Sequence, residues 1–386
     1  MPPVLRVALL VDPISARAPN AARVKAARHA LELAPALEAR GHVARVFGVP
    51  SGWGPGQAVE ADPDRVVRRL DAYQPDAVVA YDALSPAAWL GSRLSRRRRV
   101  PLVLVEAGSF AQGSWMERAA WRLGEVLWGT FVRRAADALV ALDPVARDVA
   151  LREGFRAESV QVLPHGVDVE RFRPGLPSPL VARHRIRGRI LLHPGPLDAR
   201  SGAELLIQAF ARTLGRRDDW SLVLSSEGEV PQRLRACADR LGIAARVHTL
   251  QAGEDDTPGL LSASTLVALP YGDDAPLGGI AARALACGRP LIASDLPRLA
   301  HVVQPAGVGL LASPASEVQA WVETLRQAVS DPEARKRWGA NARALALREL
   351  DWHRIAAALE RVIQGAAERA SGGTDPNGSL PVERAG

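Results

Sequence analysis

A loop bounded by two glycines has the composition of a phosphate-binding turn. Gly195 and Gly202 enclose it, the apolar run ILLH precedes it, and the amphipathic run AELLIQAF follows it. In doubly wound sheets, ligands bind beyond the carboxyl ends of the strands. A helix that begins there presents N–H groups and the positive end of its dipole to anions. The sequence therefore predicts a phosphate contact at this loop, and a plain strand-to-helix connection is the alternative.

The elements that position this loop follow one rhythm along the chain. Short apolar runs alternate with longer amphipathic ones, which predicts parallel sheets joined by crossover helices. In the first half, strands are expected at Leu5–Val11, Val43–Gly48, Ala77–Tyr81, Leu102–Glu106, Ala138–Ala141 and Val160–Leu163. In the second half, they are expected at Ile190–His193, Ser221–Leu224, Val247–Leu250, Leu266–Pro270, Leu291–Ser294 and Gly309–Ala312. Each half thus has enough strands for one doubly wound sheet.

Amphipathic runs predict the helices that cover these sheets. They are expected at Ala21–Glu38, Pro63–Ala72, Pro86–Ser95, Trp115–Ala135, Gly202–Arg212, Pro231–Leu241, Glu317–Ser330, Pro332–Leu350 and Trp352–Ala370, with a short helix within Asp295–Ala300. Residues 173–189 are rich in Pro, Gly and Arg and are predicted to be a linker. The tail 371–386 is polar and turn-rich, so it is expected to be disordered.

The bulk composition is that of a globular chain with two domains of ordinary size. Its 386 residues are 47% hydrophobic and 24% charged, and no apolar run reaches the ~18–20 residues that cross a bilayer. Cys237 and Cys287 are far apart in the sequence, which fits a reducing cytoplasm. The N-terminus lacks a signal-like pattern, so a cytoplasmic location is expected.

The net charge is +7, and nearly all the basic residues are arginine. Arg96, Arg97, Arg98 and Arg99 form the densest cluster, and the segment Trp115–Arg134 carries tryptophans at helical spacing between further arginines. Together they predict a peripheral face for an anionic membrane. A solvated arginine run beside a core-packed helix is the alternative. No nucleic-acid partner is expected, because the cluster has no neighbouring groove-reading helix.

The segment Val162–Pro174, VLPHGVDVERFRP, resembles the inter-domain signature of the retaining glycosyltransferases of family 4. Within it, His165, Gly166 and Asp168 are expected to shape the turn between the domains. The resemblance implies an α/β fold of the GT-B class, with two Rossmann-like doubly wound domains that face a central cleft. It places the domains at 1–172 and 190–350, with a helix at 351–370 that crosses back to the first domain.

The same resemblance implies transfer of a sugar from a nucleotide-sugar donor to a glycan or a lipid-linked acceptor, with retained configuration. It implies no cofactor and no metal ion. The loop from Gly195 is similar to the family's donor-phosphate motif G-R-L-x-x-x-K-G, in which Gly195, Leu197 and Gly202 match. The family's two cations fall on Pro196 and Ser201. Arg200, one residue from the second, is the candidate that replaces them at the diphosphate.

A second motif, Arg283–Pro290, resembles the family's E-A-M-A-C-G-x-P, with Arg283 where a ribose-binding Glu would stand. Eight residues earlier, Ala275 replaces the Glu that contacts the donor sugar. Gly278 and Gly279 could still bring backbone N–H groups to an anion. Arg283 could contact phosphate or pair with an upstream aspartate. The candidates for that pairing, and for the missing sugar contact, are Asp273 and Asp274, with a solvated turn as the alternative.

The first domain departs from the family pattern too. The glycine pair expected before the first helix falls on Val24 and Lys25, and the His near the reacting centre falls on Ala107. Glu106 is adjacent, but strand alternation should point it to the opposite face. No catalytic residue is assigned. Two hypotheses remain open: a glycosyltransferase with a remodelled donor site, or a non-catalytic protein that is the partner or scaffold of an active one.

Overall fold

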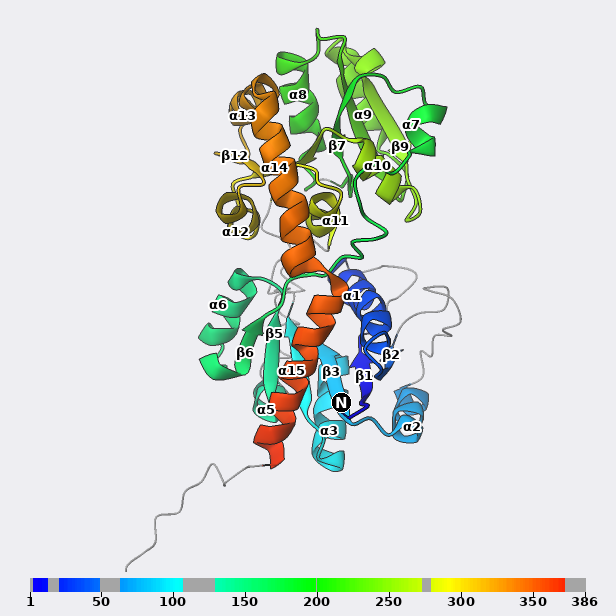
Figure 1. The fold of residues 1–386 in the computed structure, drawn as a ribbon, viewed down its shortest axis with the longest axis vertical. Helices are drawn as coiled ribbons and strands as arrows, with labels where there is room; N and C mark the ends of the chain where they lie inside the picture. Colours follow the sequence, from blue (N-terminus) through cyan, green and yellow to red (C-terminus); the bar gives the residue numbers. More distant parts are fainter. Residues whose placement is uncertain are drawn as a thin grey trace, which may run out of the picture. The chain divides into compact units, whose positions relative to one another are not determined.

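The computed structural model describes residues 3–12, 21–48, 63–106, 129–198, 200–272 and 279–371. The chain divides into two compact units, each built around its own sheet (Figure 1). Unit 1 comprises residues 1–142, 146–163 and 356–386, and unit 2 comprises residues 143–145 and 164–355. Of the predicted tail 371–386, Ser371 is the last residue of a helix, and residues 372–386 lie outside the described residues.

Unit 1 contains a six-stranded parallel sheet of order β2-β1-β3-β4-β5-β6. Its strands are β1 (Arg6–Leu10), β2 (Val43–Phe47), β3 (Ala77–Tyr81), β4 (Leu102–Glu106), β5 (Ala138–Ala141) and β6 (Val160–Val162). Every residue of β3, β4 and β5 is buried. Such continuous apolar strands are typical of parallel sheets that helices cover on both faces.

The helices of unit 1 come from both ends of the chain. They are α1 (Ala21–Glu38), α2 (Pro63–Tyr73), α3 (Pro86–Arg98), α5 (Thr130–Ala135), α6 (Pro144–Arg152) and α15 (Trp352–Ser371). Although α15 is far from this sheet in sequence, Glu360 accepts a hydrogen bond from Arg40 Nε (2.8 Å) after α1. Arg369 of the same helix donates to the carbonyl of Asp137 at the start of β5 (3.2 Å).

Unit 2 contains a second six-stranded parallel sheet, of order β12-β11-β10-β7-β8-β9. Its strands are β7 (Arg189–His193), β8 (Trp220–Ser226), β9 (Val247–Gln251), β10 (Leu266–Leu269), β11 (Leu291–Ser294) and β12 (Gly309–Ala312). All twelve predicted strands are therefore confirmed, with ends that differ by at most two residues. The two parallel sheets confirm the predicted α/β class.

The helices of unit 2 cover both faces of this sheet. They are α7 (Pro179–Arg183), α8 (Ala203–Thr213), α9 (Gln232–Arg240), α10 (Thr257–Ala263), α11 (Ile280–Ala286), α12 (Pro297–Ala306), α13 (Val318–Ser330) and α14 (Pro332–Leu345), which continues as a π-helical turn at Ala346–Leu350. The sequence did not predict α6, α7, α10 and α11. Each has fewer than ten residues, too short for a helical period to be visible.

Alternating strand residues build two cores in unit 2. Leu191, Leu222 and Ala268 pack in one cluster against α8 and α13. Leu192 and Val267 pack in the other, against α10 and α11. Since successive strand side chains point to opposite faces, one sheet supplies both cores and keeps its strand ends fixed. Truncating a fully buried residue such as Leu191 to Ala is expected to cost about 2–5 kcal/mol.

Candidate functional site

The two central strands of unit 2, β7 and β10, mark the point where the order of the sheet reverses. The chain proceeds from β7 outward to β8 and β9, then returns to β10 and continues outward to β11 and β12. In open parallel sheets, the crevice beyond the carboxyl ends of such strands is the usual ligand site. The predicted loop Gly195–Gly202 follows β7, and Tyr271 and Gly272 follow β10.

Both glycines of this loop adopt conformations that a side chain would disturb. Gly195 has φ +66°, and a Cβ built there would lie 2.6 Å from the carbonyl oxygen of Ser225. Gly202 also has φ +66°, and its Cβ would lie 1.7 Å from the carbonyl oxygen of Pro270. Left-handed backbone and close approach to a neighbouring strand end both require glycine. The loop is therefore packed directly against the ends of β8 and β10.

The residues between the glycines hydrogen-bond to their own backbone and shape the entrance to α8. Ser201, at the family's lysine position, is buried; its hydroxyl donates to the carbonyl of Asp198 (2.8 Å) and accepts from the N–H of Ala203 (3.3 Å). The Asp198 carboxylate accepts from the N–H of Arg200 (2.9 Å). The Arg200 side chain is 55% exposed and lies 3.7 Å from Asp198. Its guanidinium is thus held beside the start of α8 and accessible to solvent.

Three residues that were not singled out in the sequence, Tyr271, Gly272 and His193, make hydrogen bonds at the ends of β7 and β10. Tyr271 donates its hydroxyl to the carbonyl of Gly195 (3.0 Å), and the N–H of Gly272 donates to the carbonyl of Arg200 (2.9 Å). His193 is fully buried at the end of β7, with Nδ1 3.2 Å from the carbonyl of Ala268. Burial lowers the pKa of His193 to about 4, so the ring is neutral and Nδ1 donates to that carbonyl. These bonds join the loops after β7 and β10.

The predicted inter-domain turn contacts one of the predicted phosphate-binding residues. Gly279 has φ +85°, and a Cβ there would lie 2.6 Å from Cε1 of the His165 ring. Nδ1 of the same ring donates to the carbonyl of Gly166 (2.8 Å), and Gly166 packs against the indole of Trp352. Asp168 accepts from backbone N–H groups two and three residues later, an Asx turn. His165 therefore packs directly against Gly279, the residue that precedes α11.

Arg283 is held in a buried ion pair. It is 5% exposed, its Nη1 and Nη2 lie 3.2 and 2.9 Å from the two carboxylate oxygens of Glu254, and its guanidinium lies 5.0 Å from the centre of the Phe172 ring. For Arg283, either a phosphate contact or a pair with an aspartate was expected from the sequence, and Glu254 was not considered. The three remaining candidates of this segment, Asp273, Asp274 and Gly278, lie outside the described residues.

Comparison with known proteins identifies the family. Residues 182–345 match the family described as Glycosyl transferases group 1, and residues 26–171 match Glycosyltransferase Family 4. The chain belongs to the family 4 glycosyltransferases. It is 29% identical over 314 residues to a D-inositol 3-phosphate glycosyltransferase of Xylanimonas cellulosilytica, covering 75% of this chain and 73% of that protein. A similar relative from Salinispora tropica is 30% identical over 305 residues, covering 71% of this chain and 62% of that protein.

Solved structures share the fold at lower identity. The crystal structure of Anabaena HepE in complex with UDP and glucose has a TM-score of 0.70 and 20% identity, covering 93% of this chain and 99% of that one. A glycosyltransferase from Rickettsia africae has a TM-score of 0.74 and 12% identity, covering 94% of this chain and 98% of that one. The predicted GT-B class is therefore confirmed.

In unit 1 of this family 4 chain, the strand ends carry carboxylates. Asp12, 7% exposed after β1, accepts from the N–H of Ala87 at the start of α3 (3.0 Å). Glu106, 3% exposed at the end of β4, accepts from the N–H of Ala83 after β3 (2.6 Å). Burial, and then the charge of Asp82, raise the pKa of Glu106 well above its ordinary value. Val24, Lys25 and Ala107 lie where side chains are not described.

The predicted arginine cluster lies at the other end of unit 1, where α3 ends. Arg97 and Arg98 both pair with Asp71 of α2, and the Arg96 guanidinium lies 4.3 Å from the centre of the Phe131 ring in α5. One and two turns earlier along α3, Arg93 lies over Trp89, whose side chain is 39% exposed. The described part of the cluster is thus a solvent-facing stripe that includes one exposed tryptophan.

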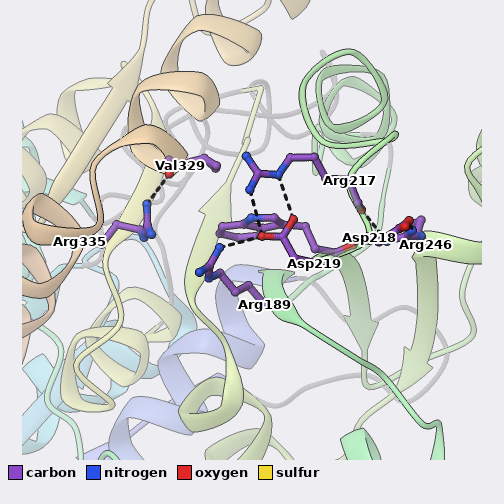
Figure 2. Close-up of polar contacts among 8 residues, drawn as sticks. Arg189, Arg217, Asp218, Asp219, Arg246, Val329 and Arg335 are labelled. Carbon is purple, nitrogen blue, oxygen red and sulfur yellow. Dashed lines mark hydrogen bonds and ion pairs between the residues drawn. The ribbon is translucent and has the colours of Figure 1, made fainter.

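A second arginine-rich network, in unit 2, lies at the amino ends of β7 and β8 (Figure 2). Asp219 accepts from Arg189 (2.8 Å) and from Arg217 (2.9 Å), and Arg335 donates to the carbonyl of Val329 at the end of α13 (2.7 Å). These amino ends lie at the edge of the sheet opposite to the carboxyl ends, beyond which ligands usually bind in open parallel sheets. The network therefore fixes the edge of the sheet and does not belong to the candidate site.

Within the described ranges, no group of three or more His, Cys, Asp or Glu side chains is arranged to hold a metal ion. The same part of the chain has no helix that is long and apolar enough to cross a membrane.

Proposed function

We propose that this chain transfers a sugar, with retention, from a nucleoside-diphosphate donor to a glycan or a lipid-linked acceptor. The observation that carries the proposal is the loop Gly195–Gly202 at the reversal point of the second sheet. Two left-handed glycines there hold the backbone against the strand ends, and α8 begins directly after Gly202. Membership of family 4 and a UDP-bound structural neighbour support the same class of donor.

The chemistry requires stabilisation of the leaving diphosphate more than a protein nucleophile. In a retaining transfer of this kind, the donor phosphate itself can take the acceptor proton while the protein stabilises the negative charge that develops on the diphosphate. In this chain, the N–H groups near Gly195, Gly202, Gly278 and Gly279 and the guanidinium of Arg200 are the proposed donors. A guanidinium that replaces the family's lysine offers several N–H donors in one plane, which suits a phosphate.

We also propose that unit 1 associates peripherally with the inner face of the cell membrane. The support is the stripe on α3, where Arg93, Arg96, Arg97 and Arg99 are exposed together with Trp89. Exposed arginines attract anionic headgroups, and an indole beside them inserts at the interface. Such a location would bring the enzyme to a lipid-linked acceptor.

The first experiment is a thermal-shift panel with UDP-, GDP-, ADP- and TDP-linked sugars. A ligand that binds only the folded state raises its stability by about 2.7 kcal/mol at a hundredfold excess over Kd. We expect a clear shift with one nucleotide, followed by sugar release when the right acceptor is supplied. No shift with any nucleotide would overturn the proposal and favour the other hypothesis, a non-catalytic partner of an active glycosyltransferase, which affinity capture would then test.

A further inference from the structure

The amino edge of the second sheet carries more positive charge than its aspartates neutralise. The neighbouring strands β7, β8 and β9 each begin at an arginine or within three residues of one. Adjacent strands lie about 4.8 Å apart, so these arginines come together although they are distant in the sequence. The arginine patch comprises Arg187, Arg189, Arg216, Arg217, Arg246 and Arg335, and the aspartates beside it are Asp218, Asp219 and Asp331. Six arginines against three aspartates leave a net charge of +3.

Asp219 holds two of these arginines in place. Its carboxylate accepts from Arg217 Nε (2.9 Å) and Nη2 (3.0 Å) and from Arg189 Nη1 (2.8 Å) (Figure 2). The ring of Trp220, which is fully buried, lies beneath Arg189, 5.9 Å from the guanidinium carbon. Hydrogen bonds from Arg217 hold the pKa of Asp219 below its ordinary value, so the carboxylate is ionised at neutral pH. One anion is thus shared by two fixed cations.

Arg335 of α14 is a third cation within electrostatic range of these two. Its Nη1 donates to the carbonyls of Ala328 (2.6 Å) and Val329 (2.7 Å) in the last turn of α13 (Figure 2). Burial, and then the positive charge of Arg189, lower the pKa of Arg335, and Arg217 acts in the same direction. Since the three guanidiniums repel one another, an anion placed among them would be attracted by all three.

Unused N–H donors remain on this surface. Among the described residues, Arg187 and Arg216 are exposed and their side chains make no hydrogen bond or ion pair. The Arg189 side chain is 48% exposed, and only its Nη1 has an acceptor in the described part of the chain. A guanidinium presents its N–H groups as a planar fork, which matches pairs of phosphate oxygens. The patch therefore combines excess positive charge with donors of suitable geometry.

We propose that the arginine patch binds an oligophosphate with an unesterified end, through hydrogen bonds from Arg189 and the charges of Arg217 and Arg335. Linked phosphates carry several charges along one line, as the arginines do along the ends of neighbouring strands. Trp220 is buried beneath Arg189, so this ring offers no anchor to an acidic peptide. A nucleotide sugar is esterified at both ends of its diphosphate and lacks the terminal charge. The site is thus separate from the loop Gly195–Gly202 and does not depend on the proposed function.

The test titrates inorganic tripolyphosphate into the full chain by calorimetry at low ionic strength. We expect the wild type to bind, with an affinity that falls steeply as salt is added. Arg189→Gln should bind roughly tenfold more weakly, because it loses a hydrogen bond to a charged group. Arg189→Lys keeps the charge without the fork, so its affinity should lie between the two. Binding of a nucleotide sugar should be the same in Arg189→Gln and the wild type.

Two further variants separate recognition from folding and from net charge. Arg361→Gln is the matched control, because it removes one exposed arginine of α15 in unit 1; it should bind tripolyphosphate like the wild type. The double variant Arg187→Gln/Arg216→Gln removes charge from the patch and leaves the bonds of Asp219 untouched, so it should weaken binding several-fold at an unchanged melting temperature.

ATP in place of tripolyphosphate identifies the source of the phosphates. Equal affinities that fall together in Arg189→Gln would show that the phosphate tail of a nucleotide is accepted as well. If the affinity for ATP is the same in Arg189→Gln and the wild type, the ligand is a free oligophosphate.

Four results would overturn the inference. The wild type could give no heat with tripolyphosphate, Arg189→Gln could bind it as tightly as the wild type, or Arg361→Gln could lose as much affinity as Arg189→Gln. A polyglutamate peptide that binds more tightly than tripolyphosphate would assign the patch to an acidic protein instead. If Arg189→Gln does not fold, the double variant decides, and wild-type affinity in it would overturn the inference equally.

Discussion

The carboxyl edges of the two sheets have opposite character, although both sheets are parallel and six-stranded. In unit 2, the strand ends meet glycines with left-handed backbone, at Gly195 and Gly202, and the nearby cation Arg200 is accessible. In unit 1, the strand ends meet carboxylates, and Asp12 and Glu106 accept the backbone N–H groups that a ligand anion could have used. The carboxyl edge of unit 2 can therefore receive a diphosphate, whereas that of unit 1 already contains carboxylates of the protein itself.

This contrast shows that topology positions a site without deciding its chemistry. Both sheets place loops at a reversal point, between β1 and β3 in unit 1 and between β7 and β10 in unit 2. What differs is whether glycine or a carboxylate follows the strand.

The largest expected effect comes from placing a side chain at Gly202, at the carboxyl edge of unit 2. Gly202→Val would place Cβ on the carbonyl oxygen of Pro270 and force a β-branched residue to φ +66°. We expect nucleotide binding to be lost and stability to fall by about 3 kcal/mol, measured by calorimetry and by chemical denaturation. Gly228→Ala is the control, because nothing lies within 4 Å of a Cβ there. Tight nucleotide binding by Gly202→Val would show that the loop is only a connection.

The second largest effect is expected from the exposed arginines of α3 in unit 1. Replacing Arg93, Arg96 and Arg99 by Gln should lower binding to phosphatidylglycerol vesicles by about a hundredfold, at about 1 kcal/mol for each arginine near the surface. High salt should abolish binding of the wild type as well. Co-sedimentation measures both. The matched variant changes Arg183, Arg185 and Arg187, which are exposed in unit 2; if it loses as much binding, the α3 stripe is not a specific face.

Arg200, at the carboxyl edge of unit 2, is expected to contribute less to nucleotide binding than the backbone of the loop Gly195–Gly202. Arg200→Gln removes the proposed contact to the diphosphate, and a hydrogen bond to a charged group corresponds to roughly tenfold or more in affinity. We expect weaker binding of the nucleotide sugar and lower turnover, with little change in melting temperature, because the side chain is half-exposed. Arg189→Gln, equally exposed at the opposite edge (Figure 2), should leave binding intact. Equal activity of Arg200→Gln and the wild type would remove Arg200 from the mechanism.

The smallest effect tests the acidic edge of unit 1. Because the pKa of Glu106 is raised by burial, the folded state binds more protons than the unfolded state above the ordinary value of 4.5. Stability therefore falls as pH rises through the folded pKa. Glu106→Gln removes this term, so its melting temperature should exceed that of the wild type at neutral pH and approach it in acid. Glu158→Gln, at an exposed site, should show neither change; a constant difference across pH would contradict the assignment.

The sequence alone predicted most of the fold because its signals are local. Apolar runs of four to seven residues gave every strand, and the glycines at positions 195 and 202 indicated the loop that the structure places at the reversal point. His165 and Gly166 were recognised as a turn from their motif. Short helices such as α7 and α10 escaped, because fewer than ten residues do not establish a period.

Only the tertiary structure could decide which distant residues meet. Arg283 finds Glu254, 29 positions earlier, and His165 packs on Gly279, more than a hundred positions later. Tyr271 and His193 make their hydrogen bonds because β7 and β10 are neighbours in the sheet, although the paired residues Leu192 and Val267 lie 75 positions apart in the sequence. Local propensity fixes where strands and turns begin. Which charges are paired and which face a ligand depends on how elements distant in the sequence pack together. No short stretch of sequence encodes that packing.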